Sequence, residues 1–343
     1  MARLSTTILD VLFLVGVSYV MATIVSCLSG LDMCMTLPAA FVMCAVVWVI
    51  TEILQVPTSG KAVLVTGCDS GFGHALALRL DQLGFRVFAG CLFAKAGGEG
   101  ALRLKREGSA RLHVLQLDLT SNEQLDDVLE EVKNKLPVGE VFWGLVNNAG
   151  IALVGSTEWN PVEHFKKVAD VNLFGLVAVT KRFLPLIRRC KGRVVNVTSV
   201  LGRSPISYNS AYVSSKYAIE GFSDCLRLEM KQFGVKVCII EPGSHVIATK
   251  VLTKEMLESQ RDNCWSTMSE EVRAAYGETA FKEAYAAMVD HGEADIQPVI
   301  EVMVKSLTQR FPRARYCSAN GYYVLRVFIS QHLPDWVFNV FYC

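Results

Sequence analysis

Two long apolar runs open the chain, and a short polar turn separates them. Val11–Leu28 holds 18 residues without a charged side chain, and Met33–Thr51 holds 19. A helix of about 17–25 apolar residues is long enough to cross a bilayer, and the Ser-Gly-Leu-Asp sequence at 29–32 fits the turn of a hairpin. We therefore expect residues 1–58 to form a membrane anchor of one or two transmembrane helices.

Two other interpretations of this leader fit less well. The apolar core of a cleaved signal peptide spans about 7–15 residues, and no small-x-small cleavage site follows the first run. A mitochondrial presequence is amphipathic and rich in arginine, whereas the first thirty residues contain only Arg3. With two spans, both ends of the hairpin lie on one side of the membrane, and Arg3 and Lys61 favour the cytosol. We expect an endoplasmic reticulum membrane with the remaining chain in the cytosol, and a mitochondrial membrane is the alternative.

Beyond the leader, short apolar runs alternate with helical patterns. Lys61–Thr66 is a β-branched run, a helical pattern covers 74–83, and Phe85–Gly90 is a second short run. The later runs have the same length: Leu112–Leu117, Val141–Val146, Arg193–Val197 and Val235–Ile240. This alternation predicts an α/β fold of the Rossmann type, with a doubly wound parallel sheet in a single catalytic domain over about residues 60–250.

Charge and cysteine content exclude two classes of protein. The net charge of +1 gives no basic footprint for nucleic acid. The eleven cysteines form no C-x-x-C pair, and none has histidine neighbours at zinc-ligand spacing. We therefore expect free thiols, no metal site and no nucleic-acid partner.

The segment after the first strand has the pattern of a phosphate-binding loop. Glycines at 67, 71 and 73 let the backbone turn sharply and approach a pyrophosphate, which the N-terminus of the following helix attracts. A strand before the loop and a strand after the helix make the pattern specific. The expected cofactor contacts are Thr66, Gly67, Asp69, Ser70, Gly71, Phe72 and Gly73.

The end of the second strand bears on the choice of cofactor. An acid there usually binds the adenosine ribose of NAD, and an arginine accommodates the 2′-phosphate of NADP. The residues here are Cys91, Leu92 and Phe93, so neither signal is present. Without a nearby arginine NAD is favoured, and Lys95 keeps NADP as the alternative. Asp118 follows the third strand and is expected beside the adenine.

Four motifs in order resemble the signature of the short-chain dehydrogenase/reductase family: TGxxxGxG at 66–73, Asn-Asn-Ala-Gly at 147–150, Ser199, and Tyr212-x-x-x-Lys216. The resemblance implies a catalytic tetrad of Asn172, Ser199, Tyr212 and Lys216, in which Asn172 holds a water beside the lysine. It also implies cofactor contacts from Asn148, Ala149, Gly150, Tyr212, Lys216, Pro242 and Gly243.

The chemistry of these residues is consistent with that assignment. Tyr212 and Lys216 are four residues apart and share one face of a helix. A tyrosine hydroxyl has a pKa of about 10, which the lysine ammonium and a positive nicotinamide ring would lower toward working pH. Tyr212 can then take the alcohol proton as hydride leaves the carbon, and Ser199 can hydrogen-bond the substrate oxygen. The non-enzyme alternative is a catalytically silent membrane scaffold of the same fold.

Longer stretches resemble one membrane-anchored cluster of that family. AVLVTGCDSGFG at 62–73 and WGLVNNAG at 143–150 are similar to hydroxysteroid (17β and 11β type 2), retinol and D-β-hydroxybutyrate dehydrogenases, and to an insect member of the ecdysteroid pathway. An anchored enzyme can collect a lipophilic alcohol from the bilayer, whereas anionic hydroxybutyrate needs a cation that Gly243–Thr249 offers only as His245. We therefore rank a steroid or sterol first, a retinoid second and hydroxybutyrate third, with His245 as a candidate substrate contact.

Residues 251–343 are expected to cover the substrate and end in an apolar segment. The aromatic residues and methionines of 250–295 are more typical of a core than of a lipid pocket. The segment 322–342 fits a membrane contact, a partner contact or a buried packing element. By resemblance, helices at about 163–185 and 209–231 pair two copies, so a homodimer is possible.

Overall fold

The globular part of the chain is built on one parallel sheet. The computed structural model describes residues 2–249, 251–288 and 292–342. Seven strands follow the order β3-β2-β1-β4-β5-β6-β7, and every neighbouring pair is parallel. The strands are β1 (Lys61–Thr66), β2 (Arg86–Cys91), β3 (Leu112–Gln116), β4 (Val141–Asn147), β5 (Arg193–Val197), β6 (Lys236–Pro242) and β7 (Arg315–Ser318). The predicted doubly wound sheet is confirmed.

Helices cover both faces of this sheet, because successive side chains of a strand point to opposite faces. Val63 and Val65 of β1 pack under one helical layer, and Ala62 and Leu64 pack under the other. The first layer is α3 (Gly71–Gln82), α4 (Glu99–Glu107) and α13 (Gln297–Thr308). The second layer is α5 (Asn122–Lys135), α7 (Leu176–Arg189) and α8 (Ser210–Met230).

Most predicted strands lie within one or two residues of their observed bounds, but the pattern missed β7. This strand has four residues, Arg315–Ser318, of which only two are buried. A run that short carries no periodicity. It becomes a strand because the exposed edge of β6 pairs with it in parallel, in the register Ile240↔Tyr316.

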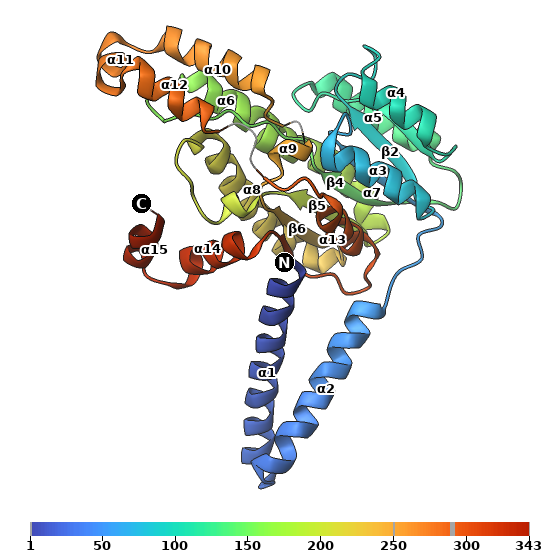
Figure 1. Cartoon of the computed structure of the whole chain (residues 1–343). Coiled ribbons are helices and arrows are strands. Elements are labelled where there is room, and N and C mark those ends of the chain that lie inside the picture. Colours follow the sequence, from blue (N-terminus) through green and yellow to red (C-terminus); the bar gives the residue numbers. More distant parts are fainter. Residues whose placement is uncertain (1, 250, 289–291, 343) are drawn as a thin grey trace.

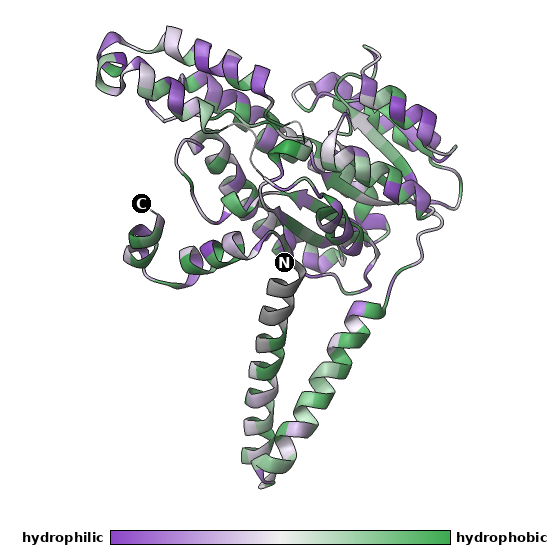
Figure 2. Cartoon of the chain, viewed as in Figure 1, coloured by the Kyte–Doolittle hydropathy of each residue, from purple (hydrophilic) through white to green (hydrophobic). Residues whose placement is uncertain are grey.

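The leader forms a helical hairpin, α1 (Ala2–Ser29) and α2 (Met33–Ile53), joined by a turn in which Gly30 has a φ of 72°. Figure 1 shows the two helices meeting at this turn, far from the sheet, and diverging toward the domain. By length and composition α2 can cross a membrane, and the described apolar stretch of α1 is Phe13–Ser29. Figure 2 shows the apolar character along α2. Within the described residues one helix therefore qualifies as a span, where one or two were expected.

The C-terminal end of α2 is bonded to the globular part. Oε1 of Glu52 lies 3.0 Å from Nη2 of Arg313, and its Oε2 accepts from Nε2 of Gln309 at 3.0 Å and from Lys305 at 3.4 Å. Backbone bonds continue this contact, since the amide of Val56 donates to Thr308 O at 2.7 Å. Charge and hydrogen bonds therefore connect the hairpin to the end of α13 and the loop that follows it.

Two helical groups complete the molecule. α10 (Lys254–Thr267), α11 (Glu270–Tyr276) and α12 (Glu278–Ala286) lie at the end opposite the hairpin (Figure 1). α14 (Gly321–His332) and α15 (Asp335–Tyr342) extend beside the domain end of α1. These last two helices bury Arg326, Val327, Ile329 and Phe338, but they expose a series of large apolar side chains: Tyr322, Leu325, Phe328, Leu333, Trp336, Val340 and Phe341. The segment is therefore not a wholly buried packing element.

The contact at Glu52 makes a prediction about stability. Glu52→Gln removes the charge that faces Arg313 and Lys305, so we expect the free energy of unfolding to fall by about 1–2 kcal/mol. Thermal melting of the detergent-solubilised protein measures this as a loss of about 2–4 °C. Glu229→Gln, at an exposed carboxylate of α8, is the control. Equal melting temperatures for both variants and the wild type would contradict the bonded contact.

Candidate active site

The turn after β1 packs so tightly that its glycine positions leave no room for a side chain. Gly67 and Gly71 have φ values of 69° and 58°, in the left-handed region. A Cβ on Gly67 would lie 2.7 Å from Cα of Ala149, and a Cβ on Gly73 would lie 2.3 Å from Gly67 O. The loop is therefore packed against itself and against the end of β4, with the N-terminus of α3 at its centre.

The segment after β4 bonds directly to this loop. Nδ2 of Asn148 donates to Thr66 O at 2.9 Å and to Gly67 O at 3.1 Å. The amides of Asn148 and Ala149 both donate to Oγ1 of Thr66 at 3.0 Å. Asn147 points instead into the core, where Nδ2 donates to Asn196 Oδ1 at 2.8 Å. The two motifs thus form one structural unit at the carboxyl ends of neighbouring strands.

A cavity of about 1310 Å³ opens above this unit. Its wall includes the expected cofactor contacts from the loop, from Asp118, from Asn148–Gly150 and from Pro242–Gly243. Gly73 is the exception, because it lies under the loop against Gly67. The cavity, the glycine cradle and the helix N-terminus together fit a dinucleotide.

Three of the four expected catalytic side chains, Ser199, Tyr212 and Lys216, line this same cavity. Tyr212 and Lys216 lie on the buried side of α8, and Nζ of Lys216 is 5.4 Å from the centre of the Tyr212 ring. Nζ donates to Val197 O, at the end of β5, at 3.0 Å. Ser199 follows that strand and caps the short 3₁₀ helix η2 (Val200–Gly202), accepting from Leu201 N at 3.2 Å. The sheet edge and one helix therefore bring these three groups together.

Burial dominates the electrostatics of this group. It raises the pKa of Tyr212 to about 12, although a hydrogen bond with Ser199 acts in the opposite direction. It lowers the pKa of Lys216 to about 8, against the stabilising charge of Glu220. Without the cofactor, burial therefore outweighs the hydrogen bond with Ser199. The lowering of the Tyr212 pKa expected from the lysine together with the nicotinamide ring stays a prediction.

Asn172 does not reach the cavity and is 1% exposed. It lies in a π-helical turn, η1 (Asp170–Gly175), between α6 (Val162–Ala169) and α7. Its Oδ1 accepts from Ile151 N at 2.8 Å, and its Nδ2 donates to Ile151 O at 3.0 Å and to Ser215 Oγ at 3.1 Å. Its amide thus ties the segment after Gly150 to α8, beside Lys216.

The loop after β6 reaches the cavity through His245 and Thr249. Nδ1 of His245 lies 3.1 Å from Glu293 O, and its ring packs edge-on against Phe72 at 5.4 Å. Thr249, in the short helix α9 (Val246–Thr249), accepts from Ser70 Oγ at 3.2 Å. Ile247, between His245 and Thr249, is 50% exposed and lies outside the cavity wall. Thr249 therefore contacts the glycine-rich loop through its backbone.

The sequence indicated Asp69 as a cofactor contact but not its partners. Oδ2 of Asp69 accepts from Leu92 N at 2.8 Å, and Oδ1 accepts from Phe93 N at 3.1 Å. A carboxylate therefore lies at the end of β2, although none of the residues that follow this strand is acidic. The feature of the sequence that could have indicated it is an acid inside the glycine-rich loop.

The far wall of the cavity comes from the covering helices. The aromatic residues of 250–295 form a core around Trp159, which stacks on Tyr208 at 5.2 Å and meets Phe281 edge-on at 4.9 Å. Their predicted core role is confirmed. Residues that pattern reasoning did not assign also line the cavity: Leu252, Met256, Ala284, Ala287 and Tyr323. Leu252, Ala284 and Met288 belong both to this core and to the cavity wall.

Known proteins resemble the chain over most of its length. The family model for short chain dehydrogenases matches residues 61–260. The mitochondrial D-beta-hydroxybutyrate dehydrogenase of Rattus norvegicus is 43% identical over 288 residues, 83% of this chain and 84% of that protein. Retinol dehydrogenase 5 of Mus musculus is 41% identical over 279 residues, 79% of this chain and 85% of that protein.

Solved structures share the fold. A short-chain dehydrogenase from Streptomyces avermitilis matches with a TM-score of 0.61 at 25% identity, covering 78% of this chain and 91% of that one. A short chain dehydrogenase from Burkholderia cenocepacia, in complex with NADP, matches with a TM-score of 0.60 at 19% identity, covering 81% and 95%. The second likeness concerns the fold alone.

The bonds of Asn172 predict that its loss destabilises the protein itself. Asn172→Ala leaves the N–H and C=O of Ile151 without these partners, at a cost of about 2–3 kcal/mol. Denaturant unfolding of the cofactor-free protein measures it, with Asn134→Ala on the exposed side of α5 as the control. Unchanged stability with lost activity would instead favour a role confined to the bound water that the family resemblance implies.

Proposed function

Because the chain belongs to the short-chain dehydrogenase family, we propose that it is a membrane-bound, NAD-dependent enzyme that interconverts a lipophilic alcohol and its ketone. As a member of that family it is an oxidoreductase that acts on alcohols with a nicotinamide cofactor. The substrate we propose is a steroid or sterol. The observation that carries the proposal is that Ser199, Tyr212 and Lys216 face one cavity together with the glycine-rich loop.

The roles we assign follow from where these groups lie. The bound cofactor supplies the carbon that accepts hydride and a positive charge near Tyr212. The hydroxyl of Tyr212 takes the alcohol proton, and Ser199 hydrogen-bonds the same substrate oxygen as its charge changes. Lys216 adds positive charge beside the Tyr212 ring and holds the cofactor ribose. Since burial alone raises the pKa of Tyr212 to about 12, proton removal depends on these positive charges.

The proposed preference for NAD rests on Asp69. Its carboxylate is fixed by the amides of Leu92 and Phe93, directly after the strand whose end approaches the adenosine ribose. A carboxylate there can accept from ribose hydroxyls, and it repels the 2′-phosphate of NADP. Asp69 thereby supplies the acid that the end of β2 lacks.

The lining of the cavity supports a lipophilic substrate. Its substrate side includes a set of apolar side chains: Val154, Ile206, Val246, Leu252, Met256 and Met288. Apart from Lys216, the described wall carries the lysines Lys166 and Lys167, both on α6. The six apolar side chains of the substrate side fit an uncharged steroid or sterol.

Two other substrates are favoured by similarity. The 43% identity to a D-beta-hydroxybutyrate dehydrogenase supports the small anionic alcohol, for which Lys166, Lys167 and His245 of the described wall are the available contacts. The 41% identity to retinol dehydrogenase 5 supports a retinoid. A retinoid suits the same apolar wall, so it stays second, and hydroxybutyrate stays third.

The anchor fits a substrate dissolved in lipid. We place residues 1–58 in the endoplasmic reticulum membrane, with residues 60–250 as the catalytic core and 251–343 covering the substrate on the cytosolic side. A mitochondrial membrane is the alternative. We also propose that α6–α7 and α8 pair two copies into a homodimer, as in the family.

Turnover by membranes that carry the protein tests the proposal directly. We expect NAD reduction with 3β-, 11β- or 17β-hydroxysteroids and loss of about 10²–10⁴-fold in kcat for Tyr212→Phe, since that variant lacks the proton acceptor. Its NADH affinity, followed by cofactor fluorescence, should stay within about twofold, because the hydroxyl is a small part of the cofactor's contacts. Tyr217→Phe, on α8 but outside the cavity wall, is the matched control.

The same panel, extended to retinol and D-3-hydroxybutyrate, decides between the substrates. Activity on hydroxybutyrate alone would overturn the lipophilic assignment. No activity on any alcohol of the panel, with NADH still bound, would favour the catalytically silent scaffold of the same fold. Equal loss of activity and NADH affinity in Tyr212→Phe would contradict the role given to that residue.

The role of Asp69 makes a separate prediction. Asp69→Asn removes the repelling charge, so the preference for NAD over NADP should fall by about tenfold or more. The ratio of kcat/KM for the two cofactors measures it. Asp118→Asn is the control, because Asp118 also lines the cavity but its carboxylate binds Thr120 at 2.7 Å. A ratio that changes equally in both variants would argue against a specific role for Asp69.

A further inference from the structure

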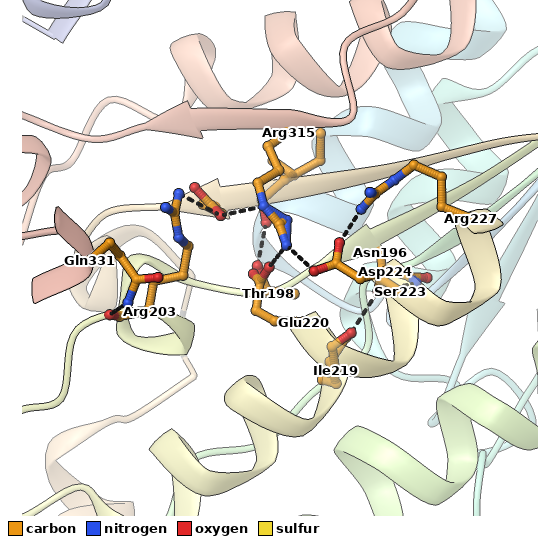
Figure 3. A network of polar contacts seen from close by, with 12 residues as sticks. Asn196, Thr198, Arg203, Ile219, Glu220, Ser223, Asp224, Arg227, Arg315 and Gln331 are labelled. Atoms are coloured by element: carbon orange, nitrogen blue, oxygen red, sulfur yellow. Dashed lines mark hydrogen bonds and ion pairs between the residues drawn. The ribbon is translucent and has the colours of Figure 1, made fainter. Parts of the chain in front are cut away.

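A network of charged side chains begins one helical turn beyond Lys216. Arg315 lies at its centre, with Nη2 3.1 Å from Glu220 Oε2 and 2.6 Å from Asp224 Oδ2 (Figure 3). Its Nε is 3.9 Å from Oε1 of Glu241, and Nη1 of Arg203 is 3.5 Å from that same oxygen. The sixth member, Arg227, pairs with Asp224. None of the six lines the cavity, and proton transfer by Tyr212 uses none of them.

The network joins the elements that carry the proposed catalytic groups. Glu220 is on α8, four residues after Lys216, and Glu241 is in β6, directly before the cavity residue Pro242. Arg203 follows η2, four residues after Ser199, and Arg315 begins β7. Glu220 is 6% exposed and Glu241 is fully buried. Carboxylates are buried this deeply only when cations accompany them.

On the basis of the proposed function, we propose that Glu220 is a positioning residue that keeps Lys216 in its charged form. The ammonium of Lys216 donates to the neutral carbonyl of Val197. Glu220 lies four residues later on α8, a spacing that places two side chains next to each other on a helix, and both are buried. Its carboxylate is therefore the anion that stabilises the charge of Lys216. Lys216 in turn favours the phenolate of Tyr212 and holds the cofactor ribose. Glu220 therefore acts on the reaction through Lys216, without touching substrate or cofactor.

The charge next to Lys216 gives the physical reason. Three arginines and three carboxylates make the ionised network neutral overall, and Glu220 is its member nearest to Lys216 in the chain. Neutralising Glu220 removes the negative charge beside Lys216. Loss of a nearby opposite charge disfavours protonation of an amine, with shifts of about 1–3 pH units. Lys216 then releases its proton at lower pH, and the phenolate of Tyr212 loses its support.

The groups around Glu220 place the protonation of its carboxylate near neutral pH. Burial raises its pKa to about 7, Glu241 adds to the rise, and Thr198, Arg315 and Arg203 oppose it. The other charged groups packed nearby are Asp224 on the same helix and Lys216 itself. Cys317 on β7 also faces the pair, and burial keeps its thiol protonated by raising its pKa to about 12. As pH falls through 7, Glu220 takes up a proton and the oxidation rate should fall with it.

Glu220→Gln tests the proposal, because glutamine keeps the size of the side chain and removes the charge. Glutamine is uncharged at every pH and so reproduces the protonated form of Glu220. We therefore expect the acidic limb of the kcat/KM profile for alcohol oxidation, which Tyr212 then sets without support from Glu220, to lie about one pH unit higher. NADH affinity, measured by fluorescence against pH, should begin to weaken at a pH about one unit lower than in the wild type. This second readout follows Lys216 without turnover. It therefore stands if the chosen alcohols are not substrates, in which case only the proposed function fails.

Asp224→Asn is the matched control, since Asp224 pairs with the same Arg315 but lies eight residues from Lys216 and has a side chain 44% exposed. Both midpoints should stay at their wild-type values in this variant. If Glu220→Gln does not fold, the double variant Glu220→Gln, Arg315→Gln removes both partners and leaves neither charge of that pair buried alone. Because Glu220 is the stabilising anion, the same two shifts are expected. A folded variant with uniformly reduced activity and unmoved midpoints would overturn the proposal and leave Glu220 a purely structural residue.

Discussion

The close packing of the glycine-rich turn against the end of β4 is the constraint on which the site depends. β1 and β4 are neighbours in the sheet although β2 and β3 come between them in the chain, so the helices that follow them leave on opposite faces. A crevice opens at such a reversal of strand order. Asn148 and Thr66 bond across it, and the missing Cβ of Gly67 lets the two turns touch. Every group assigned to the reaction is placed relative to this junction.

Burial gives the site its chemical character. Tyr212 and Lys216 lie on the side of α8 that faces the sheet edge, where Lys216 is buried and Tyr212 is half-buried. In this environment the ordinary order of the two pKa values is reversed, with a more basic phenolate and a more acidic ammonium. Charge on one group must then be supported by charge on another. In the proposed mechanism, the arginines and carboxylates behind α8 and the cofactor in front of it would supply that support.

The parts outside the sheet connect the site to its surroundings. The covering helices close the apolar end of the cavity and are themselves held by the aromatic core around Trp159. On the other side, Glu52 and the backbone of residues 54–56 bond the helical hairpin to α13 and the loop that follows it. Tyr323 of α14 lines the cavity, while its neighbours Tyr322 and Leu325 are exposed, and the same helix contacts α1. One helix therefore lies between the site and the hairpin.

The sequence by itself determined what depends on local pattern. Short apolar runs between helical patterns predicted six of the strands and the parallel sheet, and the spacing of Tyr212 and Lys216 placed both on one face of a helix. The apolar run at Met33–Thr51 predicted α2. Glycine spacing identified the loop, because only glycine permits its backbone angles.

Only the tertiary structure decided the rest, because it depends on residues far apart in the chain. β7 is too short to carry a periodic signal and forms on the edge of β6. Asp69 meets the end of β2 more than twenty residues later, and Arg315 meets Glu220 across nearly a hundred. The direction of the Tyr212 pKa also required the fold, since the loss of water around a group is set by everything packed on it and not by its neighbours in sequence.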